Sequence, residues 1–438
     1  MEIGSFIKLE RKKRNMTQEE LSEGIVSVSY LSKIENNKAD VNPNTIKLLC
    51  NRLGIEINDN EKKYLEVEKK CKEWYDMLFD RYDKRVMTEK YEELQQLIST
   101  NINDQAITFE IHKIRYYIVL RDFKKALKQI NDLHEMVDTF SDTHAYYWYK
   151  FKGDYYSFKE DYQQSMQCYQ LAEEKIRLAN IDEVEIADLH YALSIAHSKL
   201  LNGMEAINYA KKAMTVFQRD YNFVRCAQCH ILLGISYQRI KMNDIAIKNY
   251  NQAMRLGKLE NDEQIIQLTH LNLGRFYLIV EESKQSIKNY SLALASGDLD
   301  CASKLEAITR LMQFSYKNSE YLKAKEYLRL GEDTLSLVKG EEYYRFYNYI
   351  IQAYAKLLSR DVNKFESIIK KEFIPYLMQK KDYQYLVFYA KLFAGHLEKK
   401  GRYKEAMQYY KLATSSYDKI IKLGGGIEDE KISSISDM

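Results

Sequence analysis

The chain has 438 residues, more than one hydrophobic core usually holds, so two or more structural units are expected. Its 45% hydrophobic content excludes a disordered chain, and its 2 prolines and 16 glycines are too few for the turns of a sheet protein. The net charge of +3, from 66 basic and 63 acidic residues, excludes a uniform field that attracts nucleic acid. Composition therefore predicts an all-α protein in which any DNA binding is local.

Export and metal binding are both disfavoured by the sequence. The first residues, MEIGSFIKLERKKR, lack the apolar core of a signal peptide, and no run of about 18 apolar residues follows. We expect a cytoplasmic protein with no membrane contact. The six cysteines are scattered, as reduced thiols are. Cys226 and Cys229, followed by His230, have no second pair at ligand spacing, so we expect no metal and no cofactor.

A first short helix is predicted to begin near residue 17. Thr17 and Glu20 form a capping box, in which the threonine accepts from a first-turn amide and the glutamate reaches back. Leu21 and Ile25 give this helix an apolar face. Gly24 can adopt the left-handed conformation that ends a helix.

A second short helix follows directly. Ser27 is a plausible N-cap, after which Val28, Leu31 and Ile34 recur at spacings of three. We therefore expect two short helices joined by a tight turn. The alternative is a helical hairpin that only packs on the rest of the chain.

The outer positions of the second helix suit the major groove of DNA. Ser29, Tyr30 and Lys33 are left outside the core, and base edges in that groove offer acceptors to such side chains. Amides at the helix N-terminus can meet phosphates. An upstream helix ends in the basic run of residues 11–14, and Asn42 with Pro43 begins a downstream helix.

The segment from about Gly4 to Ile57 resembles an XRE/Cro-type helix-turn-helix domain. The resemblance rests on the basic first helix, TQEEL, a turn, SVSYLSKIE, NNK and NPNTIKLL. It implies that Gln18 contacts phosphate and that Val28, Ser29, Tyr30 and Lys33 lie on the recognition helix. The turn is about one residue shorter than in phage repressors, which leaves the recognition register open by one position. The candidate DNA-binding residues are Arg14, Gln18, Ser27, Val28, Ser29, Tyr30 and Lys33.

A single copy of this segment would bind DNA weakly. Residues 1–58 contain nine basic and eight acidic side chains. Affinity from backbone contacts grows with the number of phosphates neutralised. We therefore expect a homodimer, or a tetramer, on a two-fold symmetric double-stranded DNA operator.

The rest of the chain repeats one motif. HILLGISYQRIKMNDIAIKNYNQAM at 230–254 matches HLNLGRFYLIVEESKQSIKNYSLAL at 270–294 with an offset of forty residues. A small residue in the second helix of each pair lets the first helix approach, and a tyrosine of the first helix fills the space between pairs. The small residues are Ala126, Ser165, Ala206, Ala246, Ser286, Ala324 and Ala406, with a weaker unit near Asn363.

This pattern resembles the tetratricopeptide repeat, which implies a right-handed superhelix of helix pairs with a concave groove. Most aromatic residues here are expected to pack between repeats. Polar residues on the inner face of each first helix do not build the core, and they could hold a peptide through amide and guanidinium groups. The candidate peptide-binding residues are Lys150, Asp154, Gln238, Asn272, Arg275 and Gln313.

Four segments follow from these patterns. We predict a DNA-binding domain at 1–58, a helical connector at 59–72, a repeat domain at 73–423 and a flexible acidic tail at 424–438. The joined architecture resembles the quorum-sensing family of Rap, Rgg, NprR, PlcR and PrgX, abbreviated RRNPP. This resemblance implies a transcriptional regulator controlled by a short imported signalling peptide bound in the groove.

Two other functions remain open. The repeats could instead bind a protein such as the receiver domain of a sporulation response regulator, as Rap-type relatives do. An enzyme is disfavoured, because no Gly-rich phosphate loop, G-x-S-x-G or H-E-x-x-H occurs. His190, His230 and His270 recur at forty residues, which indicates repeat packing rather than catalysis.

Overall fold

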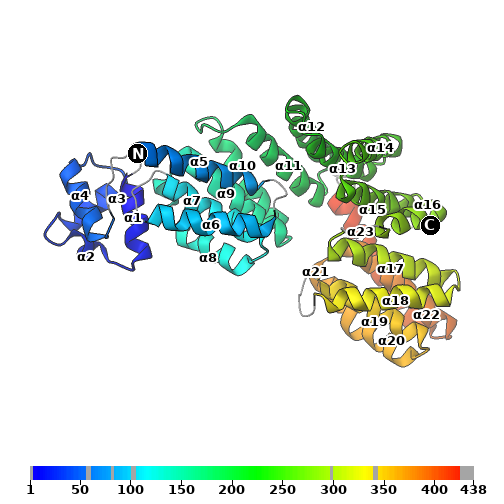
Figure 1. Cartoon of the computed structure of the whole chain (residues 1–438). Coiled ribbons are helices and arrows are strands. Elements are labelled where there is room, and N and C mark those ends of the chain that lie inside the picture. Colours follow the sequence, from blue (N-terminus) through cyan, green and yellow to red (C-terminus); the bar gives the residue numbers. More distant parts are fainter. Residues whose placement is uncertain are drawn as a thin grey trace, which may run out of the picture. The chain divides into compact units, whose positions relative to one another are not determined.

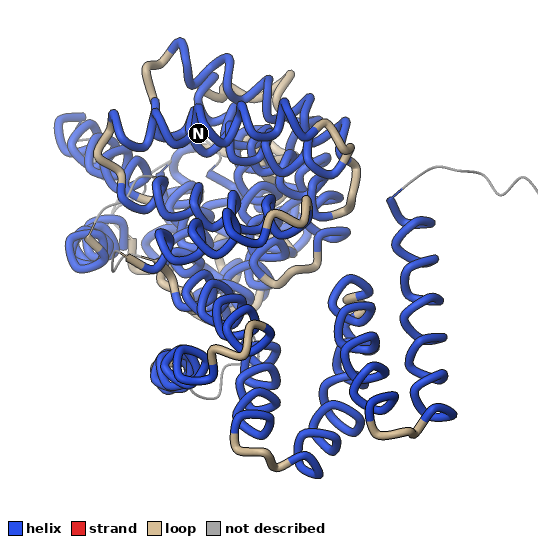
Figure 2. Tube along the Cα trace, turned by 90° about the vertical axis from the view of Figure 1, so that its right-hand side faces the viewer, coloured by secondary structure: helices blue, strands red, loops and turns tan. Residues whose placement is uncertain are grey.

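A computed structural model describes residues 3–55, 61–79, 83–99, 105–295, 299–338 and 344–424, and all regular elements in these ranges are helices (Figure 2). The chain divides into two units, 1–200 and 201–438, which are described separately. The predicted all-α class, with a helix-turn-helix domain followed by helix pairs, is confirmed. The right-handed superhelix stays a prediction.

The first unit holds the DNA-binding domain and the first helix pairs (Figure 1). Its helices are α1 (Ile3–Lys13), α2 (Gln18–Ser22), α3 (Val28–Glu35), α4 (Pro43–Arg52), α5 (Glu61–Met77), α6 (Lys84–Ser99), α7 (Gln105–Val119), α8 (Phe123–His134), η1 (Val137–Thr139), α9 (Asp142–Phe158), α10 (Tyr162–Lys175) and α11 (Glu183–Lys199).

The second unit consists of further helix pairs. Its helices are α12 (Gly203–Arg219), α13 (Phe223–Arg239), α14 (Asn243–Leu259), α15 (Glu263–Ile279), α16 (Ser283–Leu294), α17 (Cys301–Lys317), α18 (Tyr321–Ser336), α19 (Arg345–Leu358), α20 (Val362–Ile368), the π-helix η3 (Ile369–Phe373), α21 (Ile374–Lys380), α22 (Tyr383–Lys399) and α23 (Tyr403–Gly424).

Two of the predicted segments, the connector and the tail, can be compared with the described residues. From residue 61 onward, the expected connector at 59–72 is the start of α5. The expected tail lies outside the described residues from position 425. None of the described helices is long and apolar enough to cross a membrane.

The predicted helix starts in the DNA-binding domain are confirmed. The Thr17 hydroxyl accepts from the Glu20 amide and the Glu20 carboxylate accepts from the Thr17 amide, so the capping box is complete. Asn42 caps α4, with Pro43 in the first turn. Gly24 has a φ of +68°, which fits the left-handed turn after α2.

Small residues bring the paired helices together, as predicted. Ala246 and Ser286 of α14 and α16 are fully buried. In three pairs, α9–α10, α13–α14 and α15–α16, the filling tyrosine, however, comes from the second helix rather than the first. A Cβ on Gly234 would lie 2.5 Å from the Tyr250 ring, so the glycine leaves room for that ring. Tyr237, the first-helix tyrosine, is only half-buried.

The turns inside the pairs share one backbone device. The second residue after the first helix adopts a positive φ, and the amide that follows it bonds back to a carbonyl five residues earlier, which satisfies the helix end. In the α13–α14 turn, Lys241 has a φ of +61° and the Met242 amide donates to the Tyr237 carbonyl over 2.9 Å. The same positive φ occurs at Arg121, Glu160, Glu281, Ser319 and Arg360.

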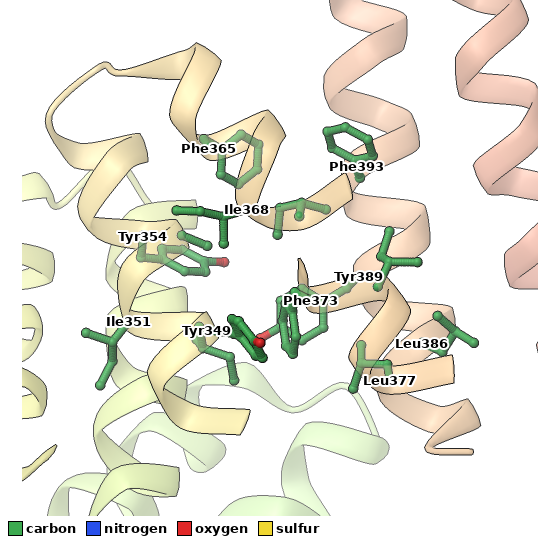
Figure 3. Packing of buried hydrophobic residues seen from close by; sticks show 14 of the residues in the cluster. Tyr349, Ile351, Tyr354, Phe365, Ile368, Phe373, Leu377, Leu386, Tyr389 and Phe393 are labelled. Atoms are coloured by element: carbon green, nitrogen blue, oxygen red, sulfur yellow. The ribbon is translucent and has the colours of Figure 1, made fainter. Parts of the chain in front are cut away.

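Aromatic rings and aliphatic side chains together form the core of the C-terminal helices (Figure 3). The Phe373 ring lies between two tyrosines, with ring centroids 5.5 Å from Tyr349 and 4.5 Å from Tyr389. These residues come from α19, η3 and α22, so the π-helix carries a central side chain of the core. Burial of this many aromatic rings stabilises the end of the repeat array.

Candidate functional site

Helix α3 presents the face that the sequence predicts for DNA. Leu31 and Ile34 are buried at 0% and 1% exposure, which fixes the helix on the domain core. On the other face Val28 is 40% exposed, and Ser29 and Lys33 are also exposed. The Ser27 hydroxyl caps the helix by accepting from the Tyr30 amide over 3.2 Å.

Two further candidates are held by hydrogen bonds within the domain. Tyr30 is half-buried, and its hydroxyl donates to the Asp40 carbonyl over 3.0 Å. The Gln18 amide donates to the buried Glu35 carboxylate over 2.8 Å. Arg11 donates to both Glu35 oxygens over 2.6 and 2.9 Å, so the ion pair ties α1 to α3. This network sets the angle at which α3 is presented.

The basic run at the end of α1 is neutralised by carboxylates. Arg11 pairs with Glu35, Lys12 with Glu135, Lys13 with Glu10 and Glu110, and Arg14 with Glu10. The candidate Arg14 is exposed but engaged, so a phosphate contact by this side chain has to compete with Glu10. The run is therefore partly a structural element.

Helix α1 also docks the DNA-binding domain on the first repeat helices, and it lies against α7 in Figure 1. Lys13 is 2.8 Å from the buried Glu110 carboxylate of α7, and Lys113 is 2.9 Å from it. Burial raises the pKa of Glu110, but the two lysine charges outweigh this effect and lower the pKa to about 2. The Ser5 hydroxyl adds a buried bond to the Thr139 carbonyl over 3.0 Å.

In the first unit, the candidate peptide residues Lys150 and Asp154 lie in ion pairs. Lys150 is fully buried, 2.6 Å from Asp188 of α11, with its ammonium over the Phe79 ring. Asp154 is 3.0 Å from Arg115 of α7 and also accepts from a buried tyrosine. Peptide contact by these two residues stays a prediction, and it would require their present partners to be exchanged.

In the second unit, Asn272 and Arg275 lie together on α15. Arg275 forms a two-point ion pair with Glu306 of α17. It also donates to the Asn272 oxygen over 3.0 Å. The Asn272 nitrogen donates to the Leu268 carbonyl, so its side chain is held in the helix.

The two glutamines are bonded to tyrosines. The Gln313 amide nitrogen donates to the Tyr389 hydroxyl over 2.7 Å, and its oxygen accepts from Arg310 over 3.1 Å. The Gln238 oxygen accepts from the Tyr250 hydroxyl over 3.2 Å. Gln238, Asn272, Arg275 and Gln313 thus belong to the second unit, and Lys150 and Asp154 belong to the first.

The first helices of the pairs, α7, α9, α11, α13, α15 and α17, are here called the inner helices. Sequence reasoning missed several charged residues on them: Arg115, Asp188, Arg239, Glu306 and Arg310. One signal was available, because Glu306, Arg310 and Gln313 are spaced i, i+4, i+7 and so share a face of α17. Arg115 and Asp188 gave no such signal, since their partners lie on other helices.

Two of the three repeated histidines, His230 and His270, make the same packing contact. His230 Nδ1 lies 2.9 Å from the Asn249 oxygen, and His270 Nδ1 lies 2.9 Å from the Asn289 oxygen. The same pair therefore recurs in successive repeats. Cys226 and Cys229 are buried, and no cluster of metal-ligating side chains occurs among the described residues.

Comparison with known proteins agrees with these two parts. A family model described as helix-turn-helix matches residues 7–60. The chain is 32% identical over 402 residues to the transcriptional activator NprA of Geobacillus stearothermophilus, which covers 90% of this chain and 98% of that protein. The chain belongs to the RRNPP family. It is a transcriptional regulator, which agrees with the prediction that it is not an enzyme.

Solved RRNPP structures share the fold. The apo form of the quorum sensor NprR from B. thuringiensis matches with a TM-score of 0.65 and 19% identity, over 81% of this chain and 99% of that one. A Rap protein complexed with Competence and Sporulation Factor matches with a TM-score of 0.65 and 18% identity, over 82% and 99%. NprR in complex with its cognate peptide NprX matches with a TM-score of 0.60 and 20% identity, over 82% and 100%.

Proposed function

We propose that this regulator acts in the cytoplasm as a homodimer, or a tetramer, on a two-fold symmetric DNA operator. A short signalling peptide, bound along the inner faces of the helix pairs, controls it. The observation that carries the proposal is the outer face of α3, where Ser29 and Lys33 are exposed on a helix whose opposite face is buried. NprA is a transcriptional activator, and NprR is solved with its cognate peptide NprX, which supports both parts of the proposal.

The contact of α1 with the repeat helices can transmit the effect of peptide binding to the DNA-binding domain. Lys13 and Ser5 bind the DNA-binding domain to α7 and η1, so a movement of those helices carries the recognition helix with it. In a dimer this movement changes the separation of two recognition helices, and with it the fit to an operator. The peptide shifts operator affinity only by its differential affinity for the two arrangements.

Substitutions on α3 and α1 test the DNA-binding surface. Lys33→Ala and Tyr30→Ala are expected to weaken operator binding by about 1–3 kcal/mol and to change the base preference. Arg14→Ala is expected to weaken binding to all sequences slightly and to flatten its salt dependence. Binding is measured by fluorescence anisotropy on selected operator DNA, with Lys124→Ala on the exposed side of α8 as the charge-matched control. Normal binding by all three variants would remove α3 as the recognition surface.

Light scattering tests the peptide. The full-length protein is measured with and without synthetic heptapeptides taken from the C-terminus of the small open reading frame beside its gene. A peptide-dependent change in mass or shape is expected, together with altered operator affinity. If every peptide leaves mass, shape and thermal stability unchanged, peptide control is wrong.

A protein partner is the second candidate function. The repeat fold matches that of a Rap protein over 82% of the chain, and an array of this kind can present a surface to a folded domain. Co-purification with a response-regulator receiver domain, abolished by peptide, would show that the repeats have this second role. Absence of co-purification would leave peptide control of DNA binding as the function.

A further inference from the structure

Three arginines lie on the inner helices of the second unit: Arg239 on α13, Arg275 on α15 and Arg310 on α17, here called the arginine cluster. Arg239 and Arg275 both act electrostatically on Tyr250. Arg275 and Arg310 both act on Tyr290 and Tyr385. Arg275 is therefore the middle member, with one arginine on each side.

The charge of this cluster is only partly balanced. Glu306 pairs with Arg275 through both of its oxygens. In the described ranges neither Arg239 nor Arg310 has a carboxylate within ion-pair distance. Arg310 instead donates to Gln313 and lies over the Tyr385 ring, with 5.2 Å between guanidinium carbon and ring centroid. Three guanidinium groups thus face one carboxylate.

All three arginines are at least partly exposed to solvent. Arg239 is exposed, Arg275 has a 41% exposed side chain, and Arg310 is half-buried. Each arginine keeps a planar fork of donors that matches a carboxylate.

Two polar atoms beside the cluster also lack partners. The Tyr290 hydroxyl and the Gln238 amide nitrogen are buried without a hydrogen bond among the described residues. Both groups can donate to an oxygen anion, and a buried donor left unsatisfied is costly. The site therefore has surplus positive charge and surplus donors together, which is the complement of an anionic ligand.

We propose that Arg239 and Arg310 bind a carboxylate of the peptide ligand, with the Arg275–Glu306 pair holding the helices between them in place. The inference rests on the peptide proposed above and adds the chemistry that the peptide must carry. The carboxylate is either the C-terminus of the peptide or an Asp or Glu side chain. Both sources present the same planar pair of oxygens to the guanidinium groups.

Four pools of synthetic heptapeptides separate the sources. They are made as free acids or C-terminal amides, each with Asp and Glu either included or replaced by Asn and Gln. Each pool is incubated with full-length protein, and the bound peptides are recovered by gel filtration and quantified by mass spectrometry. The amide pool without Asp or Glu is expected to be recovered at least about tenfold less than the free-acid pool with Asp and Glu. The two mixed pools then show which carboxylate is used.

Substitutions test whether the preference for peptides with a carboxylate depends on the arginine cluster. R239Q and R310Q are expected to remove most of the tenfold discrimination, and R255Q, on the exposed side of α14, is expected to keep it. Equal recovery of all four pools by the wild type would overturn the inference without the use of any variant. Discrimination kept by R239Q and R310Q would also overturn it. If the wild type recovers no pool at all, the proposed peptide function fails, and the inference fails with it.

Discussion

The inner helices of the two units differ in how their charges are balanced. In the first unit Lys150 pairs with Asp188 and Arg115 pairs with Asp154, so each buried or half-buried cation of this group has its own carboxylate. In the second unit the Arg275, Arg239 and Arg310 group has one ion pair among the described residues, that of Arg275 with Glu306. Buried ion pairs lock the helices that they join, whereas unpaired guanidinium groups remain available for a ligand. We therefore interpret the first inner surface as a scaffold and the second as a binding surface.

The same contrast extends to the DNA-binding domain. The first unit also holds the contacts between α1 and α7, where Lys13 and Lys113 surround the buried Glu110. Charge pairing therefore fixes both the repeat helices and the docked domain in one unit. If the first unit is rigid, a displacement of its repeat helices also displaces α3. The proposed function requires this coupling.

Breaking the Lys150–Asp188 pair is the strongest test of the scaffold. Asp188→Asn leaves the fully buried Lys150 ammonium without a carboxylate, and loss of one partner of such a pair costs about 3–5 kcal/mol. Hydrogen exchange of the full-length protein, followed by mass spectrometry, is expected to show faster opening of α9 and α11. The double variant Lys150→Met with Asp188→Leu should recover most of the protection. Unchanged exchange in Asp188→Asn would show that this pair does not hold the unit.

Removing Glu110 tests the docking of the DNA-binding domain. Glu110→Gln leaves Lys13 and Lys113 facing each other, and we expect a cost of about 2–4 kcal/mol at the α1–α7 contact. Exchange in α1 should rise while exchange in α13 to α17 stays unchanged. Glu135→Gln is the matched control, since Glu135 pairs with Lys12 at an exposed position and such pairs contribute about 0–1 kcal/mol. Equal effects from the two variants would contradict the conclusion that the buried Glu110 carboxylate holds α1 against α7.

Local signals predicted much of this architecture. The Thr17 and Glu20 capping box, the Ser27 cap and the buried small residues such as Ala246 depend on neighbours within one or two turns, or on a repeat of fixed length. Caps and periodicity therefore predicted where α3 and the helix pairs lie. The exposed face of α3 follows from the same stripe of apolar residues.

Long-range pairing explains what the sequence did not reveal. The sequence predicts DNA contact for Arg14 at the end of the basic run 11–14, and it does not reveal that Glu35, Glu110 and Glu135, from distant positions, pair with the other three members of the run. The position of Lys150 on the first helix of its pair predicts a peptide contact, yet in the fold its charge is paired with Asp188 of another helix. Whether a cation is free depends on helices far apart in sequence, which a single chain without its fold does not display.

Acid is expected to loosen the first unit before the second. His112 is buried against Tyr75, with ring centroids 3.9 Å apart, and burial lowers its pKa from 6.5 to about 3. Between pH 6.5 and pH 3 the His112 imidazole is protonated in the unfolded state but neutral in the folded state. The free energy of unfolding therefore falls as the pH drops from 6.5 toward 3. The loss is at most about 3 kcal/mol by pH 4. Hydrogen exchange at pH 7 and pH 5, corrected for intrinsic rates, measures it.

His112→Phe provides the control for this pH effect. The variant keeps a ring beside Tyr75 but cannot titrate, so the difference in first-unit protection between pH 7 and pH 5 should shrink. In the second unit, the carboxylate Glu366 has its pKa lowered to about 2, where the nearby cations outweigh burial. Its contribution to stability is lost only below about pH 4.5, so that unit should change little at pH 5. Equal loosening of both units would contradict the assignment to His112.

The smallest effect is expected where the second unit carries its unpaired charges. Arg239→Gln and Arg310→Gln remove cations that have no carboxylate partner among the described residues, so stability should stay within about 1 kcal/mol of the wild type. Arg275→Gln is the contrast within the same unit. It leaves Glu306, 9% exposed, without its two-point partner, and it should lower the urea midpoint clearly. Removing a scaffold residue lowers the free energy of unfolding, because the residue interacts with the folded chain. Removing a ligand-binding residue lowers it little, because its main interactions form with the ligand. If Arg239→Gln and Arg310→Gln destabilised the protein as much as Arg275→Gln, the whole arginine cluster would belong to the scaffold and the two inner surfaces would serve the same purpose.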